Sequence, residues 1–340
     1  MKAACYVGER TLKTIEAQPR EPAAGEVRLD VSHTGICGTD LHILHGAMDA
    51  RVHLPAVLGH EMSGTIAQIG EGVEAWSPGD RVTVMPLAWC GHCPACRAGC
   101  QHICHNLDFI GIDSPGSMQA SWTVSQDVLV ALPAGLPLAE GALAEPTAVA
   151  VHDVRRAQLQ AGEKALIVGG GPIGLLIASV ARAAGGDVLV LELNEARREF
   201  ARSLGMHTAD PAGGDLASLI DEWTHGGGAD VAFEVSGAPA GLDTAVQALG
   251  TRGRVVVVAI HSAPPPVDLF RVFWRELTLI GARVYERPDF EQAVALLADG
   301  VVPAGRLITA VEPIERVAEA FAELESGRAM KILIDCQAES

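Results

Sequence analysis

Two short segments in the N-terminal third carry side chains that can bind a transition-metal ion. HTGICGTDLHILHG contains Cys37 and Asp40, and VLGHEMSG contains His60 and Glu61. One thiolate, one imidazole and one carboxylate suit a borderline-soft ion such as Zn²⁺. Zinc catalysis requires three protein ligands and an open fourth position. A further acid, Glu145 in LAEPTAVAVHD, is a candidate ligand or a partner of metal-bound water.

A second metal site is predicted by a crowded group of cysteines in the segment CGHCPACRAGCQHIC. Closely spaced thiolates can converge on a tetrahedral zinc ion, and four sulfur ligands leave no open position, so such a site is structural. Spacing alone does not decide which four of the five cysteines bind, and nearby histidines compete for the ion. The cysteines are Cys90, Cys93, Cys96, Cys100 and Cys104, and the histidines are His92, His102 and His105.

A nucleotide site is predicted where the apolar run ALIV leads directly into glycines at G-x-G-x-x-G spacing, followed by the helical pattern LLIASVARAAG. The first glycine allows a tight turn, the second allows close approach of a pyrophosphate, and the third allows close packing of the helix. The helix N-terminus then faces the phosphates. The residues of this turn are Gly169, Gly171, Pro172, Ile173 and Gly174.

The next apolar strand ends at Glu192, whose carboxylate can accept hydrogen bonds from ribose hydroxyls and would repel a 2′-phosphate. We therefore expect NAD, with Arg197 as a further cofactor-binding residue. Arg197 and Arg198 together keep NADP as the alternative. At the end of the strand VVVVAI, Val258 and Ile260 are expected to meet the nicotinamide amide through backbone groups.

The secondary-structure elements that position these residues follow two different sequence patterns. Residues 27–130 contain short alternating or apolar runs broken by glycine and proline, which is typical of a β-rich domain. From about residue 149, apolar strands alternate with amphipathic helices, which indicates a parallel, doubly wound sheet. Two helical stretches and the strand KILIDC follow Gly281 and could close either domain. The predicted fold class is α/β.

Composition limits the partners. A chain of 340 residues with 49% hydrophobic content can form two domains. The formal net charge of −17 disfavours binding to nucleic acid, so we expect a small-molecule partner. The chain has no 18-residue apolar run without charges and no apolar stretch near its start, so we expect no membrane partner and a cytoplasmic location. Cys5 and Cys336 lie among apolar residues and are expected to be structural.

These motifs, in this order, resemble the zinc-dependent medium-chain dehydrogenase/reductase family of alcohol, sorbitol, butanediol and threonine dehydrogenases. The resemblance covers almost the whole chain. Its segments are GICGTDLH, GHEMSGTIAQIGEGVEAWSPGDRV, the cysteine loop, the Glu145 to Pro146 step, GGGPIG and ELTLIG. It implies a GroES-like catalytic domain of residues 1–147 and 284–340 with a Rossmann domain, 148–283, inserted. It also implies a homodimer or homotetramer with two zinc ions per subunit.

The resemblance also implies a role for each residue. Its catalytic-zinc positions fall on Cys37, His60, Glu61 and Glu145, the last as an exchangeable or water-linked acid. Its structural-zinc positions fall on Cys90, Cys93, Cys96 and Cys104, which leaves Cys100 as a non-ligand. The hydroxyl of a proton relay falls on Thr39 and its histidine on His42. Asp40 becomes the partner that orients a zinc-bound imidazole.

The predicted activity is oxidation of a secondary alcohol, of polyol or sugar-alcohol type, to a ketone with NAD. Zinc would stabilise the alkoxide, by about 12 kcal/mol if it lowers the hydroxyl pKa from about 16 to about 7. The nicotinamide would take the hydride. Thr39 and His42 would lead the proton out of a dry site. Arg283 and Tyr285 are candidate substrate residues.

Two other readings remain. A threonine- or sugar-acid-type dehydrogenase would have to bind a carboxylate, for which Arg283 or Arg287 is available. Ile43 stands where several sorbitol dehydrogenases have an aromatic residue, which argues against sorbitol itself. A zinc- and NAD-binding regulatory protein without catalysis would need neither an open metal position nor a proton path, so the complete set of residues argues against it.

Overall fold

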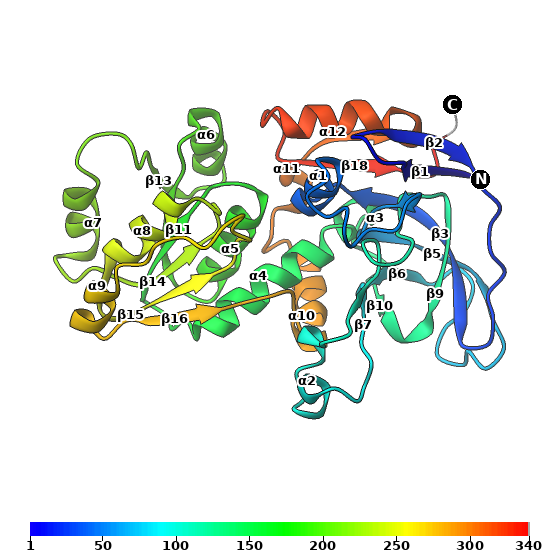
Figure 1. Ribbon diagram of the computed structural model, residues 1–340, viewed down its shortest axis with the longest axis horizontal. Helices are drawn as coiled ribbons and strands as arrows, with labels where there is room; N and C mark the ends of the chain where they lie inside the picture. Colours follow the sequence, from blue (N-terminus) through cyan, green and yellow to red (C-terminus); the bar gives the residue numbers. More distant parts are fainter. Residues whose placement is uncertain (339–340) are drawn as a thin grey trace. The chain divides into compact units, whose positions relative to one another are not determined.

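The computed structural model describes residues 1–338 and divides the chain into two compact units (Figure 1). Unit 1 comprises Met1–Glu145 and Glu286–Ser340, and unit 2 comprises Pro146–Tyr285. The boundaries expected from the sequence, 147/148 and 283/284, lie two residues inside unit 2. No helix of the described residues is long and apolar enough to cross a membrane.

Unit 1 is built on a seven-stranded sheet with the order β10-β6-β5-β3-β18-β17, with β9 also paired to β3. Smaller sheets are formed by β2-β1-β4 and β7-β8. The strands are β1 (Lys2–Tyr6), β2 (Leu12–Glu16), β3 (Glu26–Gly35), β4 (Ala56–Val57), β5 (Glu61–Ile69), β6 (Arg81–Val84), β7 (Leu87–Ala88), β8 (Asp108–Phe109), β9 (Ser121–Ser125), β10 (Leu129–Ala131), β17 (Ile308–Pro313) and β18 (Lys331–Asp335). The helices are α1 (Gly38–Leu44), α2 (Pro94–Arg97), α3 (Leu138–Gly141), α10 (Arg287–Ala298), α11 (Ala304–Leu307) and α12 (Val317–Glu325), and α4 (Ala144–Ala157) spans the boundary between the units.

The central strands of unit 1 follow the alternation of their sequence. In β3, Val27, Leu29 and Val31 are fully buried, because successive side chains of a strand point to opposite faces. The final strand β18 pairs antiparallel with β3 and parallel with β17. The C-terminal segment, whose pattern fitted either domain and which the resemblance assigned to the catalytic domain, therefore completes the sheet of unit 1.

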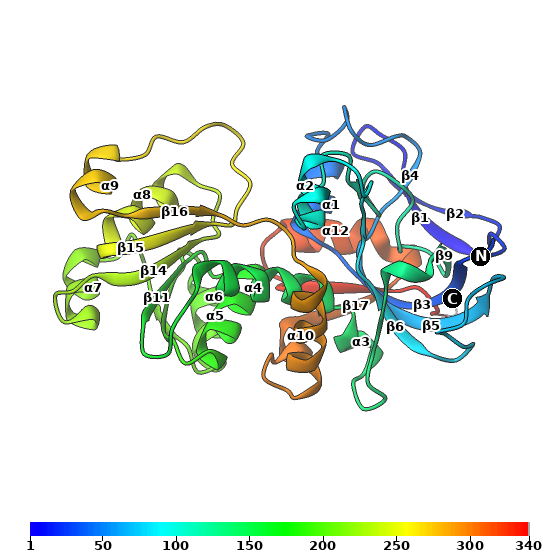
Figure 2. The same ribbon diagram turned by 90° about the horizontal axis from the view of Figure 1, so that it is seen from below.

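Unit 2 is a six-stranded parallel sheet with the order β13-β12-β11-β14-β15-β16, the order of a doubly wound nucleotide-binding fold. Figure 2 shows α5 and α6 on one face of this sheet and α8 and α9 on the other. The strands are β11 (Lys164–Val168), β12 (Asp187–Leu191), β13 (His207–Ala209), β14 (Ala229–Glu234), β15 (Leu249–Val257) and β16 (Thr278–Gly281). The helices are α5 (Pro172–Ala183), α6 (Glu195–Ser203), α7 (Leu216–Thr224), α8 (Pro239–Ala248) and α9 (Leu269–Arg275).

One end of this sheet carries an exposed apolar surface. Strand β16 is at the edge of the sheet and pairs with β15. Helix α9, which directly precedes β16 in the chain and contacts β15 and α8, has no buried residue. Four large side chains of α9 are between 67% and 75% exposed, and Leu279 of β16 is 42% exposed. We call this surface the α9 patch; it consists of Leu269, Phe270, Phe273, Trp274 and Leu279.

Candidate metal centres and nucleotide site

Cys37, His60 and Glu61 come together at one end of the central sheet of unit 1. One ligand atom of each residue lies within 4.8 Å of those of the other two. Cys37 follows β3 and precedes α1, and His60 directly precedes β5, which begins at Glu61. Because β3 and β5 are paired with Gly35 opposite Glu61, the two ligand-bearing segments meet.

Asp40 positions two of these ligands. Its Oδ2 accepts a hydrogen bond from the backbone N–H of Cys37 at 2.9 Å, which fixes the start of α1. Its Oδ1 lies 3.8 Å from Nδ1 of His60, and both of these atoms are buried without a hydrogen-bond partner among the described residues. A carboxylate beside the second ring nitrogen is the arrangement that orients a metal-bound imidazole.

The electrostatics of the centre favour a cation. Burial opposes a charge on His60, but Asp40 and Cys37 raise its pKa well above the ordinary value. For the carboxyl of Asp40, by contrast, burial raises the pKa, because it disfavours the negative charge. A buried thiol, imidazole and carboxylate in a place that stabilises positive charge fit Zn²⁺, whose ligands are deprotonated when it binds.

Glu145 lies beside this centre without belonging to its ligand group. It is 4% exposed at the start of α4 and is close enough to raise the pKa of His60. The group whose ligand atoms converge contains Glu61 and not Glu145. The geometry therefore places Glu61 nearer to Cys37 and His60, with Glu145 as a neighbouring acid.

Lys331 is a buried partner of the centre that the sequence did not reveal. Its ammonium donates to both carboxylate oxygens of Glu61, at 2.6 and 2.9 Å, and to the backbone carbonyl of Ile36 at 3.1 Å. Burial lowers the pKa of Lys331, but Glu61 and Cys37 outweigh that and raise it. The available signal was a lysine at the start of the apolar strand KILIDC, a residue type that is almost never fully buried unless paired.

The two residues assigned to a proton relay lie on α1. Thr39 is half-buried and His42 is exposed, three residues further along the same helix. Residues three apart lie on the same side of a helix, so the pair leads from the Cys37 end of α1 toward solvent. Ile43, by contrast, is fully buried in the core.

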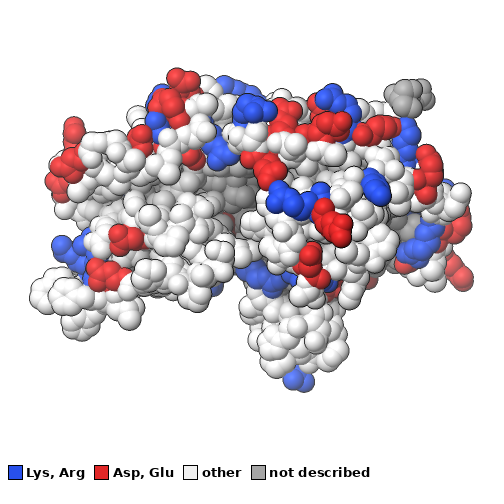
Figure 3. Space-filling model, turned by 45° about the horizontal axis from the view of Figure 1, so that its top comes forward, with Lys and Arg blue, Asp and Glu red and all other residues white. Residues whose placement is uncertain are grey.

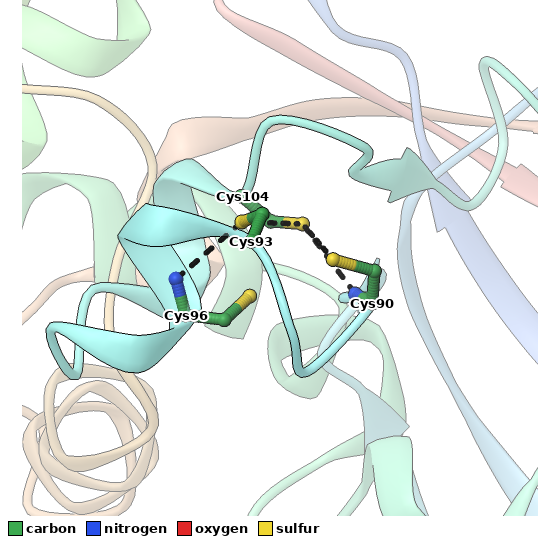
Figure 4. A group of neighbouring side chains, drawn as sticks. All are labelled: Cys90, Cys93, Cys96 and Cys104. Atoms are coloured by element: carbon green, nitrogen blue, oxygen red, sulfur yellow. Dashed lines mark hydrogen bonds between the residues drawn. The ribbon is translucent and has the colours of Figure 1, made fainter.

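The cysteine loop forms a second, closed cluster (Figure 4). The sulfurs of Cys90, Cys93, Cys96 and Cys104 lie within 4.8 Å of one another. The Sγ atom of Cys104 is 3.5 Å from that of Cys90 and 3.8 Å from that of Cys93. Cys100 is outside the group, and its thiol contacts the carbonyl of Ala98. The structure thus brings together the four cysteines expected as ligands and leaves the fifth apart.

Backbone N–H groups prepare these sulfurs for a metal. The amides of Cys96 and His105 point at Sγ of Cys93, and that of Asn106 points at Sγ of Cys104. Hydrogen bonds, the backbone amide of His92 first, lower the pKa of Cys90 to about 5, and burial raises that of Cys96 to about 12. A bound metal would deprotonate all four thiols, and four sulfur ligands suit a structural zinc.

The glycine turn of unit 2 has the geometry that a dinucleotide requires. Gly169 has a φ of 112°, which favours glycine, and Gly171 caps α5, whose first residue is Pro172. A Cβ on Gly174 would lie 1.9 Å from the carbonyl oxygen of Gly169, so the helix packs against the turn only because residue 174 is glycine. The N-terminus of α5 therefore faces the turn at which the phosphates of a dinucleotide would bind.

Glu192 and Arg197 lie next to this turn. The carboxylate of Glu192 accepts the backbone N–H of Gly170 and that of Asn194, each at 2.8 Å. A guanidinium nitrogen of Arg197 lies 4.0 Å from the position that a Cβ on Gly171 would occupy. Arg198 instead donates to the carbonyls of Glu192 and Leu193 and is 7% exposed, so it is not available for a 2′-phosphate.

The remaining predicted residues are placed as follows. Val258 follows β15 and donates its N–H to the carbonyl of Glu234, and Ile260 is 76% exposed. Arg283 is exposed, whereas Tyr285 is completely buried. Arg287 donates to the carbonyls of Asp127 and Leu129. Its guanidinium therefore holds the chain around β10, which is a structural role rather than the carboxylate site considered for it.

The doubly wound sheet with its glycine turn and the two groups of metal-ligand type fit a zinc- and nucleotide-dependent oxidoreductase, and known proteins agree. The family model described as "Alcohol dehydrogenase GroES-like domain" matches residues 23–134, and "Zinc-binding dehydrogenase" matches residues 172–299. A 2-dehydro-3-deoxy-L-galactonate 5-dehydrogenase of Pseudoalteromonas atlantica is 53% identical over all of both chains. A sorbitol dehydrogenase of Halalkalibacterium halodurans is 33% identical over 94% of each chain. The crystal structure of 2R,3R-butanediol dehydrogenase from Bacillus subtilis superposes with a TM-score of 0.90 at 32% identity, covering 98% of this chain and 99% of the other.

The chain belongs to the zinc-dependent medium-chain dehydrogenase family. The predicted fold class is confirmed, with a GroES-like domain and a Rossmann-type parallel sheet. The protein is an NAD-linked, zinc-dependent oxidoreductase that interconverts an alcohol and a ketone, as the sequence predicted.

Proposed function

We propose that this enzyme oxidises a secondary hydroxyl of a sugar acid of the 2-dehydro-3-deoxy-L-galactonate type, at carbon 5. The observation that carries this proposal is the 53% identity, over the full length of both chains, with a dehydrogenase named for that substrate. The sorbitol dehydrogenase reaches 33% over 94%. The sugar-acid alternative is thus preferred over the polyol substrate that the sequence first suggested.

In this proposal, residues of unit 1 hold the metal ion and give the released proton a path to solvent. Cys37, His60 and Glu61 are the proposed metal ligands, with Glu145 as the neighbouring exchangeable or water-linked acid. Asp40 accepts the N–H of Cys37 and faces the ring of His60. When bound, zinc lowers the pKa of a substrate hydroxyl as a Lewis acid, and NAD accepts the hydride. Thr39 Oγ1 and the ring of His42 give the released proton a route to solvent.

Unit 2 supplies the cofactor site in this proposal. The glycine turn admits the pyrophosphate, and Glu192 accepts hydrogen bonds from the adenosine ribose. Arg283, which is exposed, is the proposed residue for the substrate carboxylate. Tyr285 stays a weaker candidate because its side chain is buried.

Initial rates of NADH formation test the substrate. The panel is 2-dehydro-3-deoxy-L-galactonate, sorbitol, xylitol, (R,R)-butanediol and threonine. We expect kcat/KM for the sugar acid to exceed that for each other compound by at least about 100-fold, because a site built for polar groups discriminates strongly against compounds that leave them unpaired. A higher kcat/KM on sorbitol or xylitol would replace this proposal with the polyol activity. No NADH formation with any compound of the panel, with zinc and NAD bound, would favour a regulatory protein.

The proposal includes a homodimer, or a tetramer built from such dimers, and a cytoplasmic location. The α9 patch supports self-association, because monomers rarely expose so many large apolar side chains together. All eight cysteines are free, and two groups of metal-ligand type use five of them, which supports a reducing compartment.

A further inference from the structure

The chain that follows strand β14 lies between the glycine turn and the end of β15. Strand β14 pairs with β11 on one side and with β15 on the other. A Cβ on Gly169 of the glycine turn would lie 3.2 Å from the backbone nitrogen of Ser236. A Cβ on Gly237 would lie 3.4 Å from the carbonyl oxygen of Ile260. Residues 234–238, which we call the β14 loop, therefore lie against both segments.

The place of the β14 loop in the sheet corresponds to the nicotinamide half of a dinucleotide. In a doubly wound sheet a dinucleotide lies across the carboxyl ends of the strands, where the strand order reverses. Strand β11, which leads into the glycine turn, has β12 on one side and β14 on the other. Glu192, the residue proposed for the adenosine ribose, follows β12. The other half of the cofactor then belongs over the ends of β14 and β15.

Glu234 orders both the β14 loop and the end of β15 from a fully buried position. Its Oε1 accepts the N–H and the O–H of Ser236, at 2.9 and 2.6 Å, and the N–H of Gly237 at 3.0 Å. Its backbone carbonyl accepts the N–H groups of Val258 and Ala259, at 3.0 and 3.1 Å. Glu234 is 0% exposed, so water does not compete for these contacts.

His261 joins the chain after β15 to this carboxylate. Its Nε2 lies 3.0 Å from Oε2 of Glu234. Because the other carboxylate oxygen already accepts three hydrogen bonds, the carboxyl group is an acceptor and Nε2 is the donor. Nδ1 of His261 is buried without a hydrogen-bond partner among the described residues, and the side chain is 10% exposed. The bond to Glu234 therefore fixes the ring.

We propose that His261 is a positioning residue that acts through Glu234 to fix the backbone of residues 258–260 for the nicotinamide half of the cofactor. The chain on either side of the ring is exposed, with Ile260 at 76% and residues 262–264 all exposed, so the ring anchors this segment. Backbone groups bind a planar carboxamide well only in a narrow range of directions. The inference rests on the proposed nicotinamide contacts of Val258 and Ile260, and it holds whichever alcohol the enzyme oxidises.

Calorimetric titration of the full-length, zinc-loaded enzyme with two probes tests this inference. The probes are NADH and ADP-ribose, which has the same adenosine, pyrophosphate and second ribose but no nicotinamide. His261→Leu is expected to raise Kd for NADH about tenfold, because it removes a hydrogen bond to a buried carboxylate and releases residues 258–260. Kd for ADP-ribose is expected to stay at the parent value.

Two further variants separate the hydrogen bond from the ring. In His261→Gln the amide nitrogen can still donate to Glu234, so Kd for NADH is expected to return toward the parent value. His207→Leu removes an exposed histidine of β13 in the same unit, is the matched control, and should leave both dissociation constants unchanged. If His261→Leu does not fold, His261→Asn replaces it, because its shorter amide does not reach the carboxylate.

Two results would overturn the positioning role. Unchanged NADH binding in His261→Leu would show that the ring has no effect on the cofactor, and equal weakening of both probes would show a general role in the fold of unit 2. A parent enzyme that binds ADP-ribose as tightly as NADH would reject the nicotinamide contacts of Val258 and Ile260, and the inference with them. No alcohol is present in these titrations, so failure of the proposed sugar-acid activity is measured separately.

Discussion

At the scale of the residue, Glu192 orders the glycine turn and is proposed to bind the cofactor ribose. Its carboxylate accepts the N–H groups of Gly170 and Asn194, so it orders the glycine turn and the start of α6. A carboxylate has about four lone-pair sites, so it can still accept from ribose hydroxyls. The same negative charge disfavours the 2′-phosphate of NADP.

Glu192→Ala is therefore expected to raise KM for NAD at least tenfold, because a hydrogen bond to a charged group contributes about 1.5–3 kcal/mol. The ratio of NADP to NAD use should rise as well, with kcat less affected. Initial rates against both cofactors measure this. Glu199→Ala, which changes an exposed acid on the nearby helix α6, is the control and should behave as the parent. An unchanged KM for NAD would show that Glu192 does not meet the ribose.

Cys37 offers a second test at this scale, because its loss should empty one metal centre and spare the other. Cys37→Ser is expected to reduce zinc from two ions per chain to one and to lower kcat/KM by at least about 100-fold. The ion that remains belongs to the cysteine cluster, which is made of other residues. Zinc analysis together with alcohol oxidation measures both effects. Full activity with a single zinc would refute the assignment of the catalytic centre.

At the scale of the element, the folding of the cysteine loop is expected to depend on a bound metal, because the loop has little regular structure of its own. Helix α2 has four residues and the following 3₁₀ helix, Gln101–Ile103, has three, and helices this short are not stable alone. The loop has a small core of its own, formed by Cys93, Cys96 and Cys104 with Cys90, Ala95 and Leu107 around it. We therefore expect metal ligation by these sulfurs to supply most of the stability of the loop.

Removing this zinc, by Cys93→Ser or by a chelator, is expected to unfold the loop locally. Trypsin should then cut after the exposed Arg97 at least about tenfold faster, while the rest of unit 1 resists. Mass spectrometry of the fragments measures this. Cys100→Ser, inside the same loop but outside the cluster, should be cut at the parent rate. Equal cutting of both variants would show that the loop folds without metal.

The secondary-structure elements also explain which features could be predicted from the sequence and which could not. The strand, glycine turn and helix at residues 164–183 were predictable because each glycine answers a local steric need, as the contact of Gly174 with Gly169 shows. The cysteine cluster was predictable because its ligands are close in sequence. Lys331 was not, because its partner Glu61 is 270 positions away and they meet only through the pairing of β18 with β3. The placing of Glu145 outside the ligand group likewise depends on tertiary structure.

At the scale of the whole molecule, the distribution of charge disfavours nucleic acid as a partner, whereas the exposed apolar surface favours a second copy of this chain. On the face seen in Figure 3, acidic and basic side chains are intermixed and no continuous basic surface appears, in keeping with a net charge of −17. The α9 patch is instead apolar, and the rings of Phe270 and Trp274 stack at 5.8 Å. Strand β16, which contributes Leu279 to the patch, is the edge strand of its sheet, and its outer side pairs with no other strand among the described residues. An edge strand with an apolar helix suits a second copy of the same surface across a two-fold axis.

Phe273→Asp combined with Trp274→Asp is expected to convert a dimer into monomers. Each aromatic ring removed from an interface costs about 1.5–3 kcal/mol, so the dissociation constant should rise by more than about 100-fold. Both side chains are at least 67% exposed within the subunit, so its folding should be unaffected. Sedimentation equilibrium measures the mass, with Leu219→Asp, an exposed apolar residue of α7, as the control that stays dimeric. A monomeric parent, or a double variant that keeps the parent mass, would mean that the α9 patch is not the surface through which this enzyme self-associates.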